Sequence, residues 1–167
     1  VGAEALIRWN HPEQGVISPG HFIPVVEQTN LIVPLTLWTL RQACHDLKHS
    51  FLPLIPGFKL SVNVSGVAIQ DDEVRCEITG LIKDLSLPLH CLHIEITETS
   101  IMENIEYSAA TLEAWKSSGA DIWVDDFGTG YSSLNYLHRL PIDGLKIDRS
   151  FVHAMSDETS NRIIETI

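Results

Sequence analysis

The stretch Asp125–Asp148, DDFGTGYSSLNYLHRLPIDGLKID, decides the fold of this chain. It follows a short apolar segment, Ile122–Val124, whose composition is typical of a β-strand and which the two aspartates close. A Gly-Thr-Gly turn then leads into a helix that we expect from about Leu134 to Pro141, and residues 144–148 start another strand. A strand, a helix and a second strand in this order predict a crossover connection between parallel strands.

The same alternation of strands and helices recurs along the chain. Strands are predicted at residues 2–9, 59–64, 92–97, 122–124 and 144–148. Helical patterns are predicted at residues 21–30, 34–50, about 65–87, 102–117 and from about 157 onward. Successive strand ends lie about 20 to 30 residues apart, close to the ~31 residues of one unit of a (β/α)8 barrel.

Polar residues on one side of each predicted strand support the barrel. One parity of every barrel strand faces inward. On that parity lie Glu4, Ser61, Asn63, Glu95, Thr97, Asp125, Lys146 and Asp148. An open doubly wound sheet is the alternative, but its strands are usually continuous apolar runs. We therefore predict an α/β fold, a TIM-like (β/α)8 barrel whose polar side chains converge at the carboxyl ends of the strands.

The converging groups predict a site for hard divalent cations. Carboxylate and amide oxygens suit Mg²⁺ or Mn²⁺ and differ from the Cys and His ligands of zinc sites. The adjacent Asp125 and Asp126 are suited to serve two ions ~3.5–4 Å apart, and Lys146 adds a cation beside them. The alternative is a set of unrelated strand-end residues paired with Arg8 or Lys146 as salt bridges. One lysine and one arginine do not balance four carboxylates, which argues against that alternative.

Composition limits the classes of partner and compartment. The net charge of −11 argues against a nucleic-acid polymer as partner, since such binding needs a basic surface. The three cysteines are widely spaced and odd in number, as expected for reduced thiols of a cytoplasmic protein. The chain begins at Val1 inside a predicted strand and ends at Ile167 inside an amphipathic pattern, so we expect an excerpt of a longer polypeptide.

Five segments in this order resemble the EAL family of bacterial cyclic di-GMP phosphodiesterases: Glu4-Ala-Leu6, Ser61-Val-Asn-Val-Ser65, Glu95-Ile-Thr-Glu98, Asp125–Leu134 and Lys146-Ile-Asp148. The resemblance implies a modified TIM barrel that hydrolyses one phosphodiester bond of cyclic di-GMP to linear pGpG. It also implies that the active site binds two divalent ions, Mg²⁺ or Mn²⁺. It also implies roles for single residues.

By this resemblance the metal ligands are Glu4, Asn63, Glu95 and Asp125, and Asp126 serves the second ion. Lys146 matches the residue that orients or activates the attacking water, and with Glu4 and Asp125 it forms the expected catalytic set. The expected substrate-binding residues are Arg8 and Asp148. Glu98 matches the carboxylate that anchors the loop after the aspartate pair, and the family links that loop to dimerisation.

The resemblance also implies a single, partial EAL domain over residues 1–167. The first strand of the family would precede Val1, and the last barrel units, with a further catalytic glutamate and a later glutamine, would follow Ile167. We expect a homodimer fused to sensory or other signalling domains, in the cytoplasm or as the cytoplasmic part of a membrane-anchored protein. The alternative function is an inactive EAL domain that senses cyclic di-GMP or binds a protein partner, because the terminal segments are missing.

Overall fold

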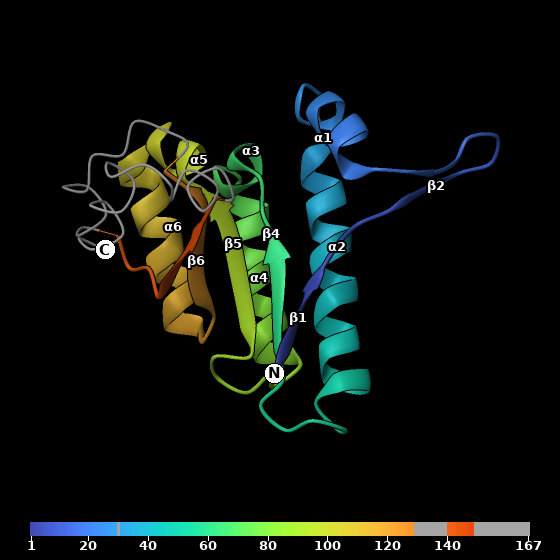
Figure 1. Ribbon diagram of the computed structural model, residues 1–167. Coiled ribbons are helices and arrows are strands. Elements are labelled where there is room, and N and C mark those ends of the chain that lie inside the picture. Colours follow the sequence, from blue (N-terminus) through green and yellow to red (C-terminus); the bar gives the residue numbers. More distant parts are fainter. Residues whose placement is uncertain (30, 129–139, 149–167) are drawn as a thin grey trace, which may run out of the picture.

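The computed structural model describes residues 1–29, 31–128 and 140–148. Five parallel strands form its main sheet, in the order β1 (Gly2–Ala5), β4 (Lys59–Asn63), β5 (Leu92–Thr97), β6 (Asp121–Phe127) and β7 (Gly144–Ile147). The strands follow one another in sequence across the sheet, and the intervening helices run alongside it (Figure 1). This is the repeated strand–helix crossover that the sequence predicts.

The sheet is curled, as in a barrel. Lys146 on β7, at one edge, places its Nζ 3.5 Å from Glu4 Oε2 on β1, at the other edge. In a flat sheet these two strands would lie four spacings of ~4.8 Å apart, or ~19 Å. A lysine and a glutamate side chain do not bridge that distance, so the sheet must wrap around its polar face. The barrel prediction is therefore confirmed for this half-barrel, and the flat open sheet is excluded.

Helices flank the sheet, and most of them bury its apolar face. They are α1 (Pro19–Glu27), α2 (Ile32–Asp46), a π-helical turn (Leu47–Phe51), α3 (Gly66–Ile69), α4 (Asp72–Asp84), α5 (Glu98–Met102) and α6 (Ile105–Ser118). The Asp71 side chain caps α4 by accepting hydrogen bonds from the amides of Glu73 and Val74. Gly119, at φ +108°, ends α6 in the left-handed conformation that glycine adopts without strain.

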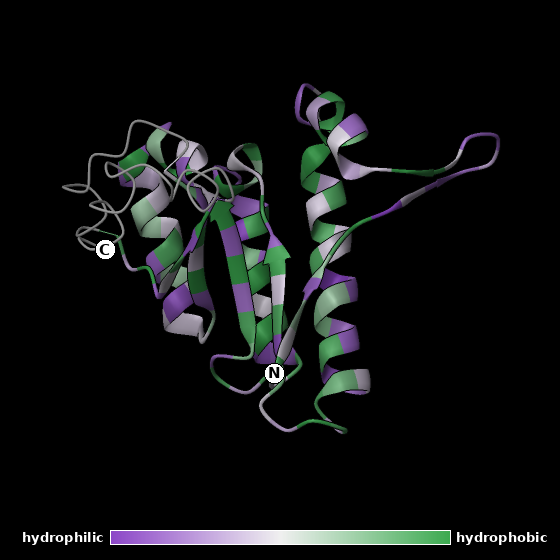
Figure 2. Ribbon diagram, in the orientation of Figure 1, coloured by the Kyte–Doolittle hydropathy of each residue, from purple (hydrophilic) through white to green (hydrophobic). Residues whose placement is uncertain are grey.

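One continuous core lies between the helices and the sheet. Its fully buried members include Leu40 of α2, Ile78 of α4, Trp115 of α6, and Ile94 and Ile122 of the strands. Buried side chains of the helices and of the strands belong to one hydrophobic cluster. Green and purple segments alternate along β5 in Figure 2, as expected for a strand with one apolar and one polar face. The opposite parity of the strands is thereby left for the polar residues of the site.

The region after β1 differs from the strand predicted at residues 2–9. The main-sheet strand ends at Ala5, and residues 9–17 form a separate antiparallel hairpin of β2 (Trp9–His11) and β3 (Gly15–Ile17). His11 Nδ1 accepts hydrogen bonds from the amides of Glu13 and Gln14 and closes the turn. The hairpin extends away from the body of the molecule (Figure 1).

Two predicted helices, from about Leu134 to Pro141 and from about residue 157 onward, fall largely or wholly outside the described residues. Among the residues that are described, no helix has the length and apolar character needed to cross a membrane.

Candidate active site

A β-bulge places the two aspartates opposite a single lysine. Val124 pairs with Leu145, and Phe127 pairs with Ile147, so Asp125 and Asp126 together face Lys146 alone. Asp126 has a φ of +52°, and its amide donates a hydrogen bond of 2.9 Å to Asp125 Oδ1. In a regular strand these neighbours would point to opposite faces of the sheet. The extra residue breaks that alternation at the end of β6, where the site lies.

Negative charge is concentrated at this bulge. The pKa of Asp126 is raised by partial burial and by the charges of Asp125 and Asp148, while Lys146 opposes the shift. Carboxylates that disfavour each other's ionisation are stabilised by an added cation. The bulge therefore favours the approach of a positive ion.

Side chains from four strands meet beside the bulge. The Lys146 ammonium donates a hydrogen bond of 2.5 Å to Glu95 Oε2 and lies 3.5 Å from Glu4 Oε2. Asn63 Nδ2 donates to Glu4 Oε1 at 2.7 Å. Glu95 is only 1% exposed, so its charge is held in a poorly solvated position by Lys146. The curled sheet thus joins β1, β4, β5 and β7 through one polar cluster.

Lys146 is held in its protonated form. Burial lowers its pKa, but the hydrogen bond and charge of Glu95, with the charges of Glu4 and Asp125, outweigh burial and raise the pKa above its usual value. The residue is therefore a fixed cation at neutral pH. Such a group can stabilise negative charge on a nearby phosphoryl oxygen or orient a water molecule.

Glu98 supports the segment after the aspartates. It is 3% exposed, at the first position of α5, and its Oε2 accepts a hydrogen bond of 3.0 Å from the Gly128 amide. Gly128 directly follows β6 and has a φ of +98°. This contact fixes the exit of the chain from β6. The rest of the predicted loop lies outside the described residues.

The donor set suits a hard divalent cation. Glu95 Oε1 is buried and accepts no hydrogen bond from any residue that the structure describes, although a buried carboxylate oxygen normally has a partner. Glu4, Asn63 and Asp125 offer carboxylate and amide oxygens from β1, β4 and β6 of the same sheet. Within the described part of the chain, however, no three Asp, Glu, His or Cys side chains are already arranged around one point. Lys146 stands between Glu4 and Glu95, so these carboxylates would have to share their oxygens between the ammonium and an ion.

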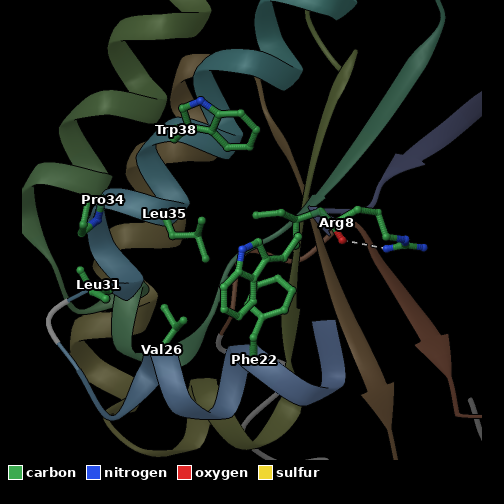
Figure 3. A pocket seen from close by; sticks show the side chains of 9 residues that line it. Arg8, Phe22, Val26, Leu31, Pro34, Leu35 and Trp38 are labelled. Carbon is green, nitrogen blue, oxygen red and sulfur yellow. Dashed lines mark hydrogen bonds between the residues drawn. The ribbon is translucent and has the colours of Figure 1, made fainter. Parts of the chain in front are cut away.

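Arg8 is separate from this cluster. Its guanidinium donates to the Ile7 carbonyl oxygen at 2.8 Å and points away from the helices that line a nearby groove (Figure 3). That groove has a volume of about 600 Å³ and is apolar, with Trp9, Phe22 and Trp38 among its lining residues. A smaller cavity of about 270 Å³ reaches the cluster at Asn63 and Glu95.

The structure therefore brings together Glu4, Asn63, Glu95, Asp125, Asp126 and Lys146, with Asp148 acting on Asp126.

Comparisons with known proteins support the resemblance to the EAL family that the five sequence segments indicate. The chain matches the EAL domain over residues 1–167. It is 40% identical to the cyclic di-GMP phosphodiesterase NbdA of Pseudomonas aeruginosa, over 89% of this chain and 19% of NbdA. It is 38% identical to the bifunctional diguanylate cyclase/cyclic di-GMP phosphodiesterase MucR of the same organism, over 98% of this chain and 24% of MucR.

Solved structures show the same relationship. The PaMucR phosphodiesterase in complex with c-di-GMP has a TM-score of 0.90 at 37% identity, over 99% of this chain and 68% of that chain. The EAL enzyme Bd1971 in its cAMP and cyclic-di-GMP bound form has a TM-score of 0.86 at 34% identity, over 99% and 46% of the two chains. This chain spans between 18% and 24% of the length of four of the curated relatives that it matches. The family match over all 167 residues shows that the chain belongs to the EAL domain family.

Proposed function

We propose that this chain supplies the core of a divalent-metal-dependent phosphodiesterase that hydrolyses one phosphodiester bond of cyclic di-GMP to linear pGpG. The observation that carries the proposal is the cluster of Lys146, Glu95, Glu4 and Asn63, beside the aspartate bulge. Two P. aeruginosa relatives are named cyclic di-GMP phosphodiesterases, and the PaMucR structure is a c-di-GMP complex. The five segments that resemble the family occur in this chain in the same order.

Each residue of the cluster has a role in this reaction. Glu4, Asn63, Glu95 and Asp125 would hold one ion, and Asp126 would contribute to a second. When bound, the ions would supply positive charge that polarises the phosphate and acidifies a water molecule. Lys146 is held by Glu95 and Glu4, and it orients the attacking water or stabilises charge on the phosphoryl oxygen. Water loses a proton as its oxygen bonds to phosphorus, one P–O ester bond breaks, and the leaving oxygen takes up a proton.

Glu98 and Arg8 act around the reacting atoms in this proposal. Glu98 accepts a hydrogen bond from the Gly128 amide and so restrains the chain two residues after the aspartate pair. Arg8 and Asp148 are the candidate substrate contacts, and Arg8 would have to turn from its present hydrogen bond to the Ile7 carbonyl oxygen to meet a phosphate.

A homodimer, fused signalling domains and a cytoplasmic location belong to the same proposal. The three unpaired cysteines, two of them buried, agree with a reducing compartment.

Product analysis tests the proposal. The natural protein that carries this chain is incubated with cyclic di-GMP and Mg²⁺ or Mn²⁺, and the nucleotides are separated by chromatography. We expect pGpG with either metal and none after chelation. A Glu95→Gln variant, with its fold checked by circular dichroism, should form no product, while Glu77→Gln, which breaks the ion pair between α4 and Arg41 of α2, should match the wild type. A folded wild type that forms no pGpG at micromolar concentration refutes the activity, and binding without cleavage would instead indicate a sensor.

A further inference from the structure

Asp143 joins β7 to β6 through two hydrogen bonds with one residue. The Asp143 amide donates to the Ile122 carbonyl oxygen at 2.8 Å. In return, the Ile122 amide donates to Asp143 Oδ2 at 2.9 Å. A single residue thereby pairs with both backbone polar groups of Ile122. The side chain adds one rung to the ladder immediately before β7 begins at Gly144.

The other oxygen of Asp143 ties the same point to a helix. Lys116, in the last turn of α6, donates to Asp143 Oδ1 at 2.7 Å. The side chains of Lys116 and Asp143 are 37% and 26% exposed, so the pair is partly shielded from water. Burial raises the pKa of Asp143, but the hydrogen bonds from Lys116 and from the Ile122 amide outweigh it and lower the pKa. Asp143 is therefore a charged acceptor shared by β6 and α6.

Gly144, the residue after Asp143, restricts the register of β7 because its backbone lies against the ring of Trp123. Trp123 pairs with Gly144, and a Cβ atom at Gly144 would lie 2.5 Å from Trp123 Cζ3, so the indole ring rests on the glycine backbone. The ring is also stacked on His93 of β5, with centroids 5.4 Å apart and planes at 16°. A residue with a side chain would not fit opposite Trp123. This contact therefore favours the alignment of β7 with β6 in which Gly144 lies opposite Trp123.

This alignment matters because few pairs hold β7 in place. Ladder pairs join Gly144 and Leu145 to β6, and the aspartate bulge then interrupts the register. Lys146 is the next residue, and its ammonium must reach Glu95 on β5, beyond β6. A slip of one residue would turn Lys146 to the other face of the sheet. The hydrogen bonds of Asp143 thus lie three residues before the cation whose position they affect.

We propose that Asp143 is a positioning residue for Lys146: by binding Ile122 and Lys116, it sets the register in which β7 presents that lysine to Glu95. The inference rests on the proposed phosphodiesterase activity for its kinetic consequence. Its structural consequence, the pairing of β7 with β6, is independent of any activity.

Kinetics and hydrogen exchange on the natural protein test the inference. In Asp143→Ala we expect kcat for cyclic di-GMP to fall by about 10- to 100-fold with little change in KM, as for a displaced catalytic group. Amide exchange at Ile122 and across β7 should be at least about tenfold faster. Asp143→Asn keeps an oxygen that accepts from the Ile122 amide, so it should restore most of kcat. Lys116→Gln, which keeps Asp143 itself, should have a smaller effect.

The control is Asp72→Ala, which removes a solvent-facing aspartate paired with Arg75 on α4. It should leave kcat and Ile122 exchange unchanged. The inference is wrong if Asp143→Ala keeps kcat within twofold, or if Ile122 stays protected in that variant. It is also wrong if Asp143→Asn is no better than Asp143→Ala. If the wild type shows no turnover, the proposed function fails, and hydrogen exchange alone decides the inference.

Discussion

At the scale of single residues, Lys146 decides how the acidic cluster can exist. Glu95 is almost completely buried, and its partner is the Lys146 ammonium. Loss of one member of a buried pair leaves the other charge uncompensated, which costs more than the pair gained. The same lysine contacts Glu4, so one cation serves two carboxylates, on β1 and β5, which only β4 separates in the sheet.

The geometry of Lys146 predicts that arginine cannot replace it. The site holds a compact ammonium 2.5 Å from Glu95 Oε2, whereas a guanidinium is planar, larger and binds carboxylates through a fork of donors. We expect Lys146→Arg to lower kcat by about 10²–10³-fold, the range for loss of one preorganised electrostatic contact. Steady-state kinetics on the natural protein measure this. Lys83→Arg, on the surface of α4, is the matched control, and equal activity of the two variants would contradict the role of Lys146.

The three cysteines should differ in reactivity. Cys44 is completely buried, which raises its pKa to about 12, and burial also raises the pKa of Cys91, whereas Cys76 is exposed. At pH 8 a thiol reagent should therefore modify Cys76 alone in the folded protein, and all three after denaturation. Mass spectrometry identifies the modified sites. Fast modification of Cys44 under native conditions would show that α2 is not packed as described.

Cys44 also contributes a pH dependence. Its folded pKa of about 12 lies above the ordinary value of 9.0, so the folded state keeps a proton that the unfolded state loses. This contribution to stability is complete below pH 9 and is lost as the pH rises from 9 towards 12. Chemical denaturation at several alkaline pH values should show the decline, and it should be smaller in Cys44→Ala.

At the scale of elements, the strands were predictable because their composition follows a simple period. Leu92–Thr97 was predicted and found with the same bounds, and its alternation puts Ile94 and Ile96 in the core. The hairpin at residues 9–17 was not predicted, because short exposed strands carry no apolar period. The bulge was also missed, since two aspartates after an apolar run predict only the end of a strand. It depends on how β7 pairs with β6, which is not a local property of the sequence.

Gly119 provides a test of a helix end. It has a φ of +108°, and a Cβ there would lie 2.6 Å from Leu89 Cδ2. We expect Gly119→Ala to lower the free energy of unfolding by about 1–2 kcal/mol, the cost of the left-handed conformation for a residue with a Cβ. Gly80→Ala is the matched control, because it lies inside α4 with open space around it and should stabilise by about 0.5–1 kcal/mol. Thermal or urea unfolding measures both, and a neutral Gly119→Ala would contradict the described helix end.

At the scale of the whole molecule, the curl of the sheet creates the site. Glu4, Asn63, Glu95, Asp125 and Lys146 come from five strands, and only a wrapped sheet brings β1 and β7 within contact. Their grouping was predictable because strand ends of a barrel share one rim, and the inward parity was visible in the alternation. The hydrogen bond between Asn63 and Glu4 and the place of Lys146 between two glutamates were not predictable. They depend on the degree of curl, which no single strand encodes.

A bound ion should therefore stabilise the whole sheet. Its proposed ligands lie on β1, β4, β5 and β6, so binding would link strands that are distant in sequence, and only the folded chain offers them together. A ligand at 100 times its Kd adds about 2.7 kcal/mol to the free energy of unfolding. We expect Mg²⁺ or Mn²⁺ to raise the Tm of the natural protein, and a chelator to reverse the rise.

Variants locate this effect in the site. Asn63→Ala removes an uncharged ligand without changing the balance of charge, and with it the hydrogen bond to Glu4. It should reduce the metal-induced rise in Tm, measured from the variant's own metal-free Tm. Gln42→Ala, a polar residue on α2 that bonds Asp46, should keep the full rise. Ions that merely screen the net charge of −11 would raise the Tm of both variants equally, and monovalent salt at the same ionic strength would reproduce the rise. That result would show that these strand-end oxygens do not share an ion.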